Sequence, residues 1–514
     1  MAMAADIDEK VSQPRQGSVD AGAHADGEKR NIRLRGDSDH VIIGDNGTDS
    51  QGSDCPAREV ERWNYPRSNV YKTFATFWAF LVMGANDSAY GPLIPYLEEH
   101  YKLSYTTVSL VFLSPIGGYT LAALTNNFLH LRFGRRGIAI LSPGCHLIAY
   151  IVNCLHPPYP VLVVSFIFAG LGNGLADSAW NAWIGNMADS NQVLGLLHGW
   201  YGLGAVLAPL VATSLITEAK VGWWYFYYIM VACAAIEVGT CVWTFWDSDA
   251  ASFKAETEAL NSSDDGGVRR ALFDRRFARV TWLLAFFLLI YVGQEVAIGG
   301  WVVTFLMRVR DGGDFASGMG ATGYWLGITF GRVVLGFITP RIGEKTAIVV
   351  SLFCSNILIS LPLLLHYNLT TLPYPTLPPS QIYNILAIVF ALIFWLVPNF
   401  YASVIAVSIQ GFFLGPMFPG AVVVATRLLP RSMHVSAIGF AAAFGASGAA
   451  VLPFAVGAIA QAKGVEVLQP FIVGLGAGMT LLWCALPRMP KRGVVQEDGN
   501  EEGQQERSRE GEQV

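Results

Sequence analysis

The stretch NFLHLRFGRR (residues 127–136) decides the fold, because a related stretch, GFITPRIGEK (residues 336–345), occurs 209 positions later. Both join apolar runs through a short turn that holds a glycine and basic residues. A second match has nearly the same offset, since Asn86–Asp87 aligns with Gln294–Glu295, 208 positions later. The sequence therefore predicts two related halves, each built around the same turn.

The composition indicates a chain that lies in lipid. Hydrophobic residues make up 53% of the 514 residues and charged residues 14%, with a mean hydropathy of +0.40. A soluble globular chain carries about 25% charged residues. A helix of about 20 apolar residues crosses the hydrocarbon core of a bilayer. Such spans are predicted at 71–97, 104–129, 138–155, 160–188, 192–216, 222–246, 279–307, 315–339, a segment that starts at 346, 403–429, 434–461 and 468–486.

These spans predict an all-α membrane protein with twelve transmembrane helices in two pseudo-symmetric six-helix bundles. Lys and Arg concentrate on the cytosolic side of membrane proteins. Thirteen of them fall in loops predicted to face the cytosol and five in loops predicted to face outward, which favours cytosolic termini. The predicted parts are a disordered tail (1–69), an N-terminal bundle (70–247), a central cytosolic loop (248–278), a C-terminal bundle (279–487) and a second disordered tail (488–514).

The spacing of the repeat changes inside the second half. Gly170 aligns with Gly411 at an offset of 241, so 32 extra residues lie between Lys345 and Gly411. Residues 350–381 account for them, and removing this stretch leaves one uninterrupted ninth span. Two explanations stay open. The stretch is either an insertion, such as a retained intron, or a longer outer loop with a glycosylation sequon at Asn368.

Several classes of function find no support in the residues. No basic stripe with interleaved aromatics indicates nucleic acid, and the net charge is −5. The seven cysteines have no metal-ligand spacing. No Walker motif or nucleophile–base signature is present, so we expect no cofactor, no metal and no enzyme activity. We expect no cleaved signal peptide either.

Four further motifs carry a family resemblance, together with the repeated turn. The turn resembles the signature of the major facilitator superfamily, with Leu131 and Pro340 where Asp is usual. The resemblance implies a secondary transporter that works by alternating access. The motifs that look like the fungal form of its fucose–proton-symporter-like branch are GANDSAYGPLIPYL (84–97), GLGNGLADSAWNAW (170–183), LHGWYGLGAVLAP (197–209) and GFFLGPMFPGAVVVATRLLP (411–430).

Three acidic residues within the spans are the candidate proton-coupling groups: Asp87, Asp177 and Glu295. A charge at the centre of a membrane helix costs about 2.5–3.5 kcal/mol on translocon scales, and such residues often serve transport. In fucose-symporter-like proteins the proton-handling acids lie on spans one and four, and the resemblance places Asp87 and Asp177 there. The alternative for each acid is a fixed hydrogen-bond network between helices. Glu237 in the sixth span lacks a paired motif, which favours a structural role.

Amide, aromatic and basic residues near these acids complete the candidate site. Amides bind hydroxyl groups and aromatic rings stack on sugar faces, which predicts the substrate-binding set Asn86, Asn181, Gln294, Trp180, His198 and Tyr201. Arg332, in the eighth span, is expected to gate the inner side or to balance Glu295. The predicted gating set is Arg132, Gly134, Arg135, Arg136, Arg332 and Arg341, for which the positive-inside bias is the alternative explanation at Arg135 and Arg136.

The sequence thus predicts a proton-coupled symporter of a sugar-like or other small polar solute. Its expected partners are the solute, protons and the lipid bilayer, and we expect a monomer in the plasma membrane. Two alternatives remain: a proton-antiport exporter of a fungal metabolite, and a membrane receptor that does not transport.

Overall fold

The computed structural model describes residues 61–188, 190–260, 267–335, 379–430 and 433–487. Within these ranges the chain is helical, and the only β-pairing is an isolated bridge between Arg62 and Tyr65. The predictions that concern the tails before 61 and after 487, the stretch 350–378, Arg341 and Asn368 lie outside the described residues.

Six helical passes come from the first half of the described chain. Helix α4 bends sharply at Gly134 and makes two of them. The helices are α1 (Arg67–Tyr101), α2 (Tyr105–Val108), α3 (Leu110–Leu113), α4 (Pro115–Cys154), α5 (Tyr159–Gly185), α6 (Ser190–Thr217) and α7 (Tyr225–Thr244).

Six further passes follow two link helices, α8 (Ala250–Leu260) and α9 (Gly267–Phe273). Helices α13 and α14 together make one of these passes. The elements are α10 (Arg275–Val309), the helical segment 314–335, α12 (Pro379–Leu396), α13 (Phe400–Leu414), α14 (Met417–Leu428), α15 (His434–Lys463), the short helix η3 (Val465–Val467) and α16 (Leu468–Cys484). Among the described residues, eight helices are long and apolar enough to cross a membrane. The order of elements agrees with the predicted twelve-helix fold.

Helix α1 begins earlier than its predicted span. It starts at Arg67, inside the range 1–69 that was predicted as a tail. The side chain of Asn69 is buried, and its Nδ2 donates hydrogen bonds to the carbonyl oxygens of Arg62 (3.1 Å) and Tyr65 (3.3 Å). These bonds hold the preceding segment against the first turn of the helix, a local effect that hydropathy does not reveal.

The bend in α4 lies in the turn that opened the sequence analysis. Gly134 has φ 68° and ψ −167°, a backbone conformation that residues other than glycine rarely adopt. A Cβ atom at this position would lie 2.2 Å from the carbonyl carbon of Asp249. The backbone N–H of Arg136 donates to the carbonyl oxygen of Ser248 (2.9 Å). The turn is therefore packed directly on the segment that follows α7.

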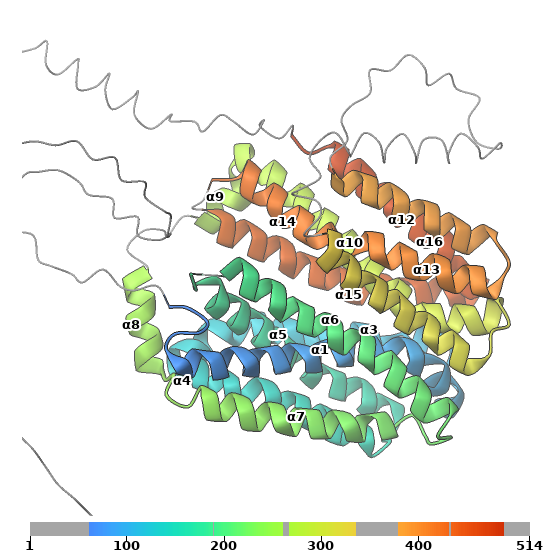
Figure 1. The fold of residues 1–514 in the computed structure, drawn as a ribbon, viewed down its shortest axis with the longest axis horizontal. Coiled ribbons are helices and arrows are strands. Elements are labelled where there is room, and N and C mark those ends of the chain that lie inside the picture. The colour runs from blue at the N-terminus through green and yellow to red at the C-terminus, as the bar shows by residue number, and fades with distance from the viewer. Residues whose placement is uncertain (1–60, 189, 261–266, 336–378, 431–432, 488–514) are drawn as a thin grey trace, which may run out of the picture. The chain divides into compact units, whose positions relative to one another are not determined.

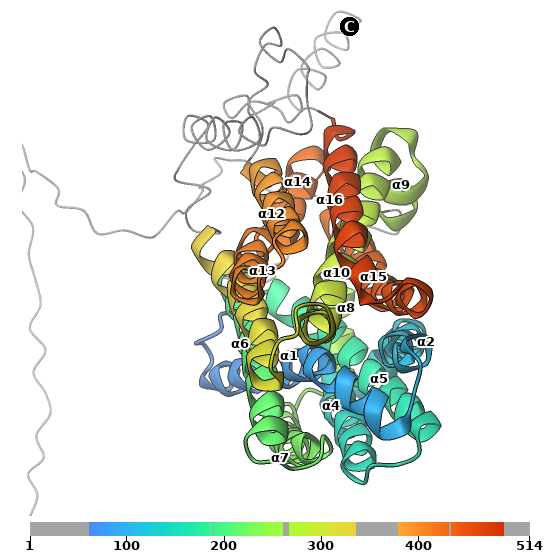
Figure 2. The ribbon, with the colours of Figure 1, turned by 90° about the vertical axis from the view of Figure 1, so that its right-hand side faces the viewer.

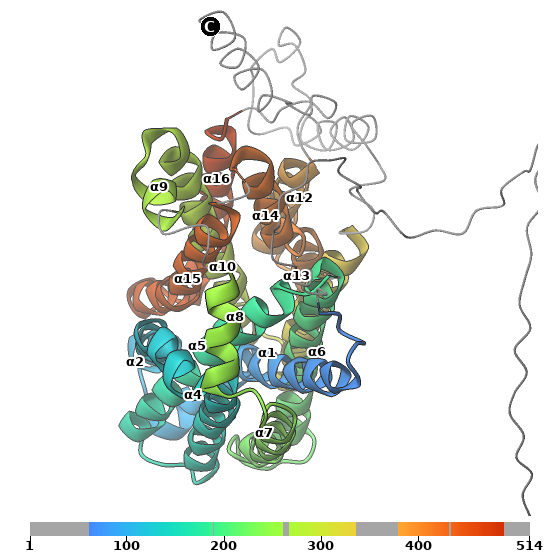
Figure 3. The ribbon, with the colours of Figure 1, turned by 90° about the vertical axis from the view of Figure 1, so that its left-hand side faces the viewer.

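The helices form two groups that correspond to the two halves of the sequence (Figure 1). In the first group α1 packs on α6, and α4 packs on α5 and α7. In the second group α10 packs on α15, and α12 packs on α13 and α16. Figure 2 and Figure 3 show the same division from opposite sides. The groups meet where α1 contacts α10 and where α2 and α3 contact α15.

Contacts between the two groups concentrate toward the C-terminal end of α1. A Cβ atom on Gly91 would lie 2.1 Å from the carbonyl oxygen of Gly299, so the backbones of α1 and α10 touch there. The backbone N–H of Tyr105 donates to Oε1 of Gln461 (2.8 Å). The predicted orientation makes this the outer end of the helices.

Candidate functional site

The Asp87 carboxyl group lies on α1 and is held by three neutral donors. Its Oδ1 accepts hydrogen bonds from Nδ2 of Asn86 and from Nδ2 of Asn173, both at 3.1 Å. Its Oδ2 accepts one from the Tyr201 hydroxyl at 3.0 Å. The donors come from α1, α5 and α6, and the Asp87 side chain is half-buried. These three bonds compensate the cost of placing a carboxylate inside a helix bundle.

A chain of polar side chains extends from Asp87 into the interior of the first group. Oδ1 of Asn173 is 2.9 Å from Nε2 of His146. Nδ1 of His146 is 3.0 Å from Oε2 and 3.2 Å from Oε1 of Glu237. His146 and Glu237 are both fully buried. Four helices, α1, α5, α4 and α7, therefore share one continuous polar network.

Asp177 lies on the same face of α5 as Asn173, one turn further on. Asn181, another turn along, donates from Nδ2 to Oδ1 (2.7 Å) and to the backbone oxygen (2.9 Å) of Asp177. Asp177 and Asn181 therefore form a hydrogen-bonded pair on α5. The spacing of four residues gives α5 a polar stripe beside α1.

The acid of the second half has a different environment. Nη2 of Arg332 donates to Oε1 (2.7 Å) and Oε2 (2.9 Å) of Glu295, which is buried on α10. The same Nη2 is 3.3 Å from the Tyr291 hydroxyl oxygen. The Tyr324 hydroxyl donates to the backbone oxygen of Glu295 (3.1 Å). Of the two roles expected for Arg332, the geometry supports charge balance of Glu295.

The predicted substrate-binding residues lie in several different environments. Asn86 and Tyr201 contact Asp87 directly, while Gln294 is buried beside Glu295 and its Oε1 has no hydrogen-bond partner among the described residues. His198 lies edge-on to Phe80, with ring centroids 5.5 Å apart. Trp180 is fully buried and stacks on Phe245 at 4.5 Å. Of the six residues in this set, Trp180 is part of the core packing of the first group.

Tyr201 lies next to a contact between the two groups of helices. It precedes Gly202, where a Cβ atom would lie 2.7 Å from Oγ1 of Thr329 in segment 314–335. Thr329 is one helical turn before Arg332. The hydroxyl that bonds to Asp87 is thus carried by a residue next to the contact between α6 and the second group.

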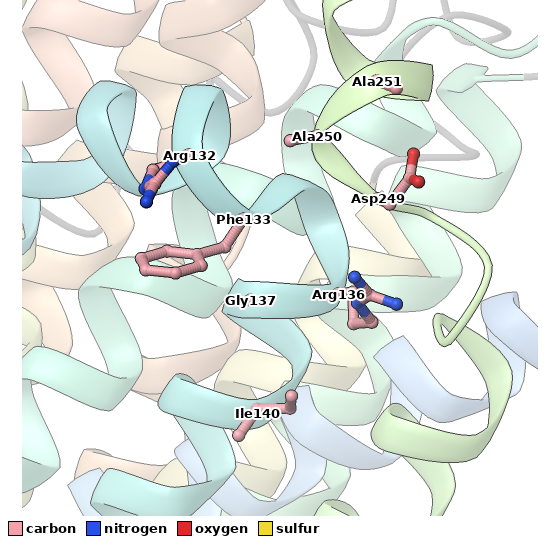
Figure 4. Close-up of a pocket in the computed structure, with 8 residues that line it drawn as sticks. All are labelled: Arg132, Phe133, Arg136, Gly137, Ile140, Asp249, Ala250 and Ala251. Carbon is pink, nitrogen blue, oxygen red and sulfur yellow. The ribbon is translucent and has the colours of Figure 1, made fainter.

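The predicted gating residues of the first turn lie on α4, at the bend that faces α8. Arg132 and Arg136 line a pocket of about 230 Å³ with Phe133, Ile140 and Asp249 (Figure 4). The Arg136 guanidinium lies 5.3 Å from the ring centroid of Trp246, and the Arg135 guanidinium lies 5.6 Å from that of Phe253. The arginines of this turn therefore contact the segment after α7.

Asp249 is the acidic residue of this pocket. A hydrogen bond from the backbone N–H of Ser252, at 2.9 Å, lowers the pKa of the Asp249 carboxyl group. Asp249 also precedes the first turn of α8, where a negative charge is favourable because backbone N–H groups point toward it.

Sequence reasoning missed Asn173 and His146 and assigned Glu237 only a structural role. One signal was available for Asn173, because it lies four residues before Asp177 and therefore on the same helix face. His146 and Glu237 lie 91 residues apart, and nothing in the sequence joins them. Within the described ranges, no three His, Cys, Asp or Glu side chains gather as metal ligands would.

Comparison with known proteins identifies the family. The model of the Major Facilitator Superfamily matches residues 76–377 and 378–510. The chain belongs to this superfamily. It is therefore a multi-pass membrane transporter and not an enzyme, and the superfamily resemblance of the repeated turn is confirmed.

This superfamily member has relatives in fungi and bacteria. Bypass of stop codon protein 6 of Saccharomyces cerevisiae is 27% identical over 430 residues, 80% of this chain and 81% of that protein. The glucose/mannose transporter GlcP of Bacillus subtilis is 20% identical over 283 residues, 54% and 69% respectively. A crystal structure of a D-xylose–proton symporter has a TM-score of 0.60 and 13% identity, covering 81% of this transporter and 98% of that chain. The last similarity concerns the fold alone.

Proposed function

We propose that this transporter couples the movement of a small polar, sugar-like solute to protons and works as a symporter. The observation that carries the proposal is the set of three neutral donors around Asp87. A carboxyl group without a bound cation can take up and release a proton without first breaking an ion pair. The assignment to the fucose–proton-symporter-like branch, the plasma membrane and the monomeric state belong to the same proposal.

Protonation of Asp87 changes what Tyr201 does. The ionised carboxylate accepts a hydrogen bond from all three donors, whereas the protonated carboxyl group needs an acceptor for its own O–H. The amide nitrogens of Asn86 and Asn173 cannot accept, but the Tyr201 hydroxyl can. Its O–H then turns away from Asp87 and becomes available to a solute. Because Gly202 packs on Thr329, this change occurs beside the contact between the two halves.

Polar atoms without partners support a hydroxylated solute. Oδ1 of Asn86 and Oε1 of Gln294 are buried and have no hydrogen-bond partner among the described residues. Such atoms are costly unless a ligand or water satisfies them. Both accept hydrogen bonds, as hydroxyl groups of a sugar require. Two similar proteins, a glucose/mannose transporter and a D-xylose–proton symporter, support the same class of solute.

Alternating access would require the outer contacts to separate. The Gly91–Gly299 approach and the Tyr105–Gln461 hydrogen bond join the halves at the outer end of α1. We assign the opposite, inner end to gating by the first turn. There Gly134, Arg135 and Arg136 contact the segment after α7, and Arg132 lines the same pocket as Asp249.

Flux in reconstituted vesicles tests the proposal. The full chain is reconstituted into proteoliposomes. Accumulation of radiolabelled D-glucose, D-mannose, D-xylose and L-fucose is then measured with and without an inward proton gradient. Gradient-driven accumulation of one sugar is expected, and it should be lost in Asp87→Asn and in Asp177→Asn while counterflow exchange continues. Asp314→Asn, at an exposed carboxyl group, is the control and should behave as wild type.

Other outcomes would overturn the proposal in distinguishable ways. Full proton-driven accumulation in both variants would show that Asp87 and Asp177 do not couple solute transport to protons. Proton-driven extrusion of solute would indicate an antiport exporter instead. Binding of a sugar without any flux would indicate a receptor.

A further inference from the structure

The buried His146–Glu237 pair lies away from the atoms that touch Asp87, yet Asn173 joins it to that carboxyl group. The side chain of Asn173 spans the gap, with Nδ2 at 3.1 Å from Oδ1 of Asp87 and Oδ1 at 2.9 Å from Nε2 of His146. An amide nitrogen only donates and an amide oxygen only accepts hydrogen bonds. When Asp87 is ionised, one orientation of the Asn173 amide group gives the carboxylate a donor and His146 an acceptor, whereas the opposite orientation turns the amide oxygen toward the carboxylate.

The directions of these bonds fix one proton on His146. Because Oδ1 of Asn173 accepts, Nε2 of His146 must carry hydrogen. Nδ1 faces both carboxyl oxygens of Glu237, so one further proton is held between Nδ1 and the carboxyl group. Without that proton, two acceptors would face each other in a fully buried place. The pair with Glu237 thus keeps Nε2–H pointing at Asn173.

We propose that His146, held by Glu237, is a positioning residue that fixes the orientation of the Asn173 amide group and thereby sets the pH at which Asp87 exchanges its proton. The inference rests on the proposed function, because it concerns the same carboxyl group. If His146 no longer donates, the amide group is free to turn and present its oxygen to Asp87. The ionised carboxylate then loses a donor, and Asp87 retains its proton to a higher pH.

Other titratable groups surround this network on every helix packed against it. Among them, the Tyr119 phenol also interacts with the Asn173 side chain, whereas the other phenols and thiols have no hydrogen bond to Asn173 among the described residues. On α4 the Tyr150 ring stacks on the imidazole, with centroids 5.9 Å apart. The groups are Tyr150 and Tyr119 on α4, Tyr90 and Asp87 on α1, Asp177 on α5, Tyr201 on α6, and Tyr227, Cys233 and Cys241 on α7.

The packing of α5 reserves space for the imidazole. A Cβ atom on Gly172 would lie 2.5 Å from Cδ2 and 2.6 Å from Nε2 of His146. The ring therefore fits against α5 only because residue 172 has no side chain. The same close approach brings Nε2 within reach of Asn173, the next residue along.

Infrared titration of the full chain in lipid vesicles tests the inference without a solute. The carbonyl band of protonated Asp87 is identified as the band that Asp87→Asn removes, and its midpoint is read across pH. The test variant is His146→Phe/Glu237→Leu, in which apolar side chains replace the whole pair and no unpaired charge stays buried. The midpoint is expected to rise by about one pH unit, the equivalent of losing one hydrogen bond to a charged group.

Two further variants separate positioning from general disturbance. His146→Gln carries an amide N–H that can still donate to Asn173, so its midpoint should stay near that of the wild type. Tyr150→Phe removes a buried hydroxyl that has no hydrogen-bond partner among the described residues, and it should leave the midpoint unchanged. An unmoved midpoint in the double variant overturns the positioning role and leaves the proposed symport intact. If Asp87→Asn removes no titrating band, both proposals fail.

Discussion

Arg332 donates two hydrogen bonds to the carboxylate of Glu295, at 2.7 and 2.9 Å. The internal repeat aligns Glu295 with Asp87. Among the described residues, Asp87 accepts hydrogen bonds from neutral donors only. The duplicated positions have therefore diverged in their electrostatics. The second half holds a charge-balanced pair, and the first half holds a carboxyl group whose hydrogen-bond donors are all neutral among the described residues.

Removing Arg332 should destabilise the fold more than removing the charge of Glu295. Arg332→Leu leaves the Glu295 carboxylate, which is only 6% exposed, without its cation. The free energy of unfolding should fall by up to about 3–5 kcal/mol. Glu295→Gln leaves an arginine that is 21% exposed and can reach water, so its cost should be smaller. Thermal unfolding of the detergent-solubilised variants measures the order. Arg308→Leu is the control, because its exposed contact with Glu98 at 4.0 Å should contribute less than about 1 kcal/mol.

Tyr201→Phe should weaken coupling more than it weakens solute exchange. The change removes the only hydroxyl partner of Asp87 among the described residues, and with it the acceptor that the protonated carboxyl group requires. Proton-driven accumulation in vesicles is expected to fall by about tenfold, the equivalent of one hydrogen bond to a charged group, while counterflow exchange is retained. Tyr96→Phe, at a half-buried phenol elsewhere on α1, should keep both activities. An equal loss of accumulation and exchange would assign Tyr201 to solute binding alone.

The sequence predicted the fold and singled out Asp87 as a candidate because both depend on local or repeated patterns. Apolar length defines a membrane helix, and the repeat at 127–136 and 336–345 marks the duplication. Asp87 was recognisable because a carboxyl group is rare within such a span. The pairing of Arg332 with Glu295 was one of two expected roles, and only the packing of α10 against segment 314–335 distinguishes them.

The remainder of the site depends on which helices pack together, and a single sequence does not contain that information. His146 and Glu237 pair because α4 packs on α7, and Asn173 reaches Asp87 because α5 lies beside α1. The substrate role predicted for Trp180 shows the same limit. In a chain rich in aromatic residues, a tryptophan that stacks in the core has the same sequence signature as one that faces a ligand.

Gly134→Ala should destabilise the turn at the bend of α4. Alanine is strained at φ 68°, and its Cβ atom would lie 2.2 Å from the carbonyl carbon of Asp249. We expect a loss of more than about 1 kcal/mol in the free energy of unfolding. Gly144→Ala on the same helix is the matched control, because a Cβ atom there meets nothing within 4 Å and alanine favours the helix. Equal thermal stability of the two variants would contradict the strain argument.

Gly172→Ala should reproduce part of the effect of removing His146. The new methyl group would overlap the imidazole ring, at 2.5 Å from Cδ2, so the ring must move away from Asn173. The infrared midpoint of Asp87 is then expected to rise in the same direction as in the double variant, by up to about one pH unit. Gly185→Ala, at the end of the same helix with open space around its Cβ position, should leave the midpoint in place. A Gly172→Ala protein that is as stable as wild type and titrates at the wild-type midpoint would show that the position of the imidazole does not control the proton on Asp87.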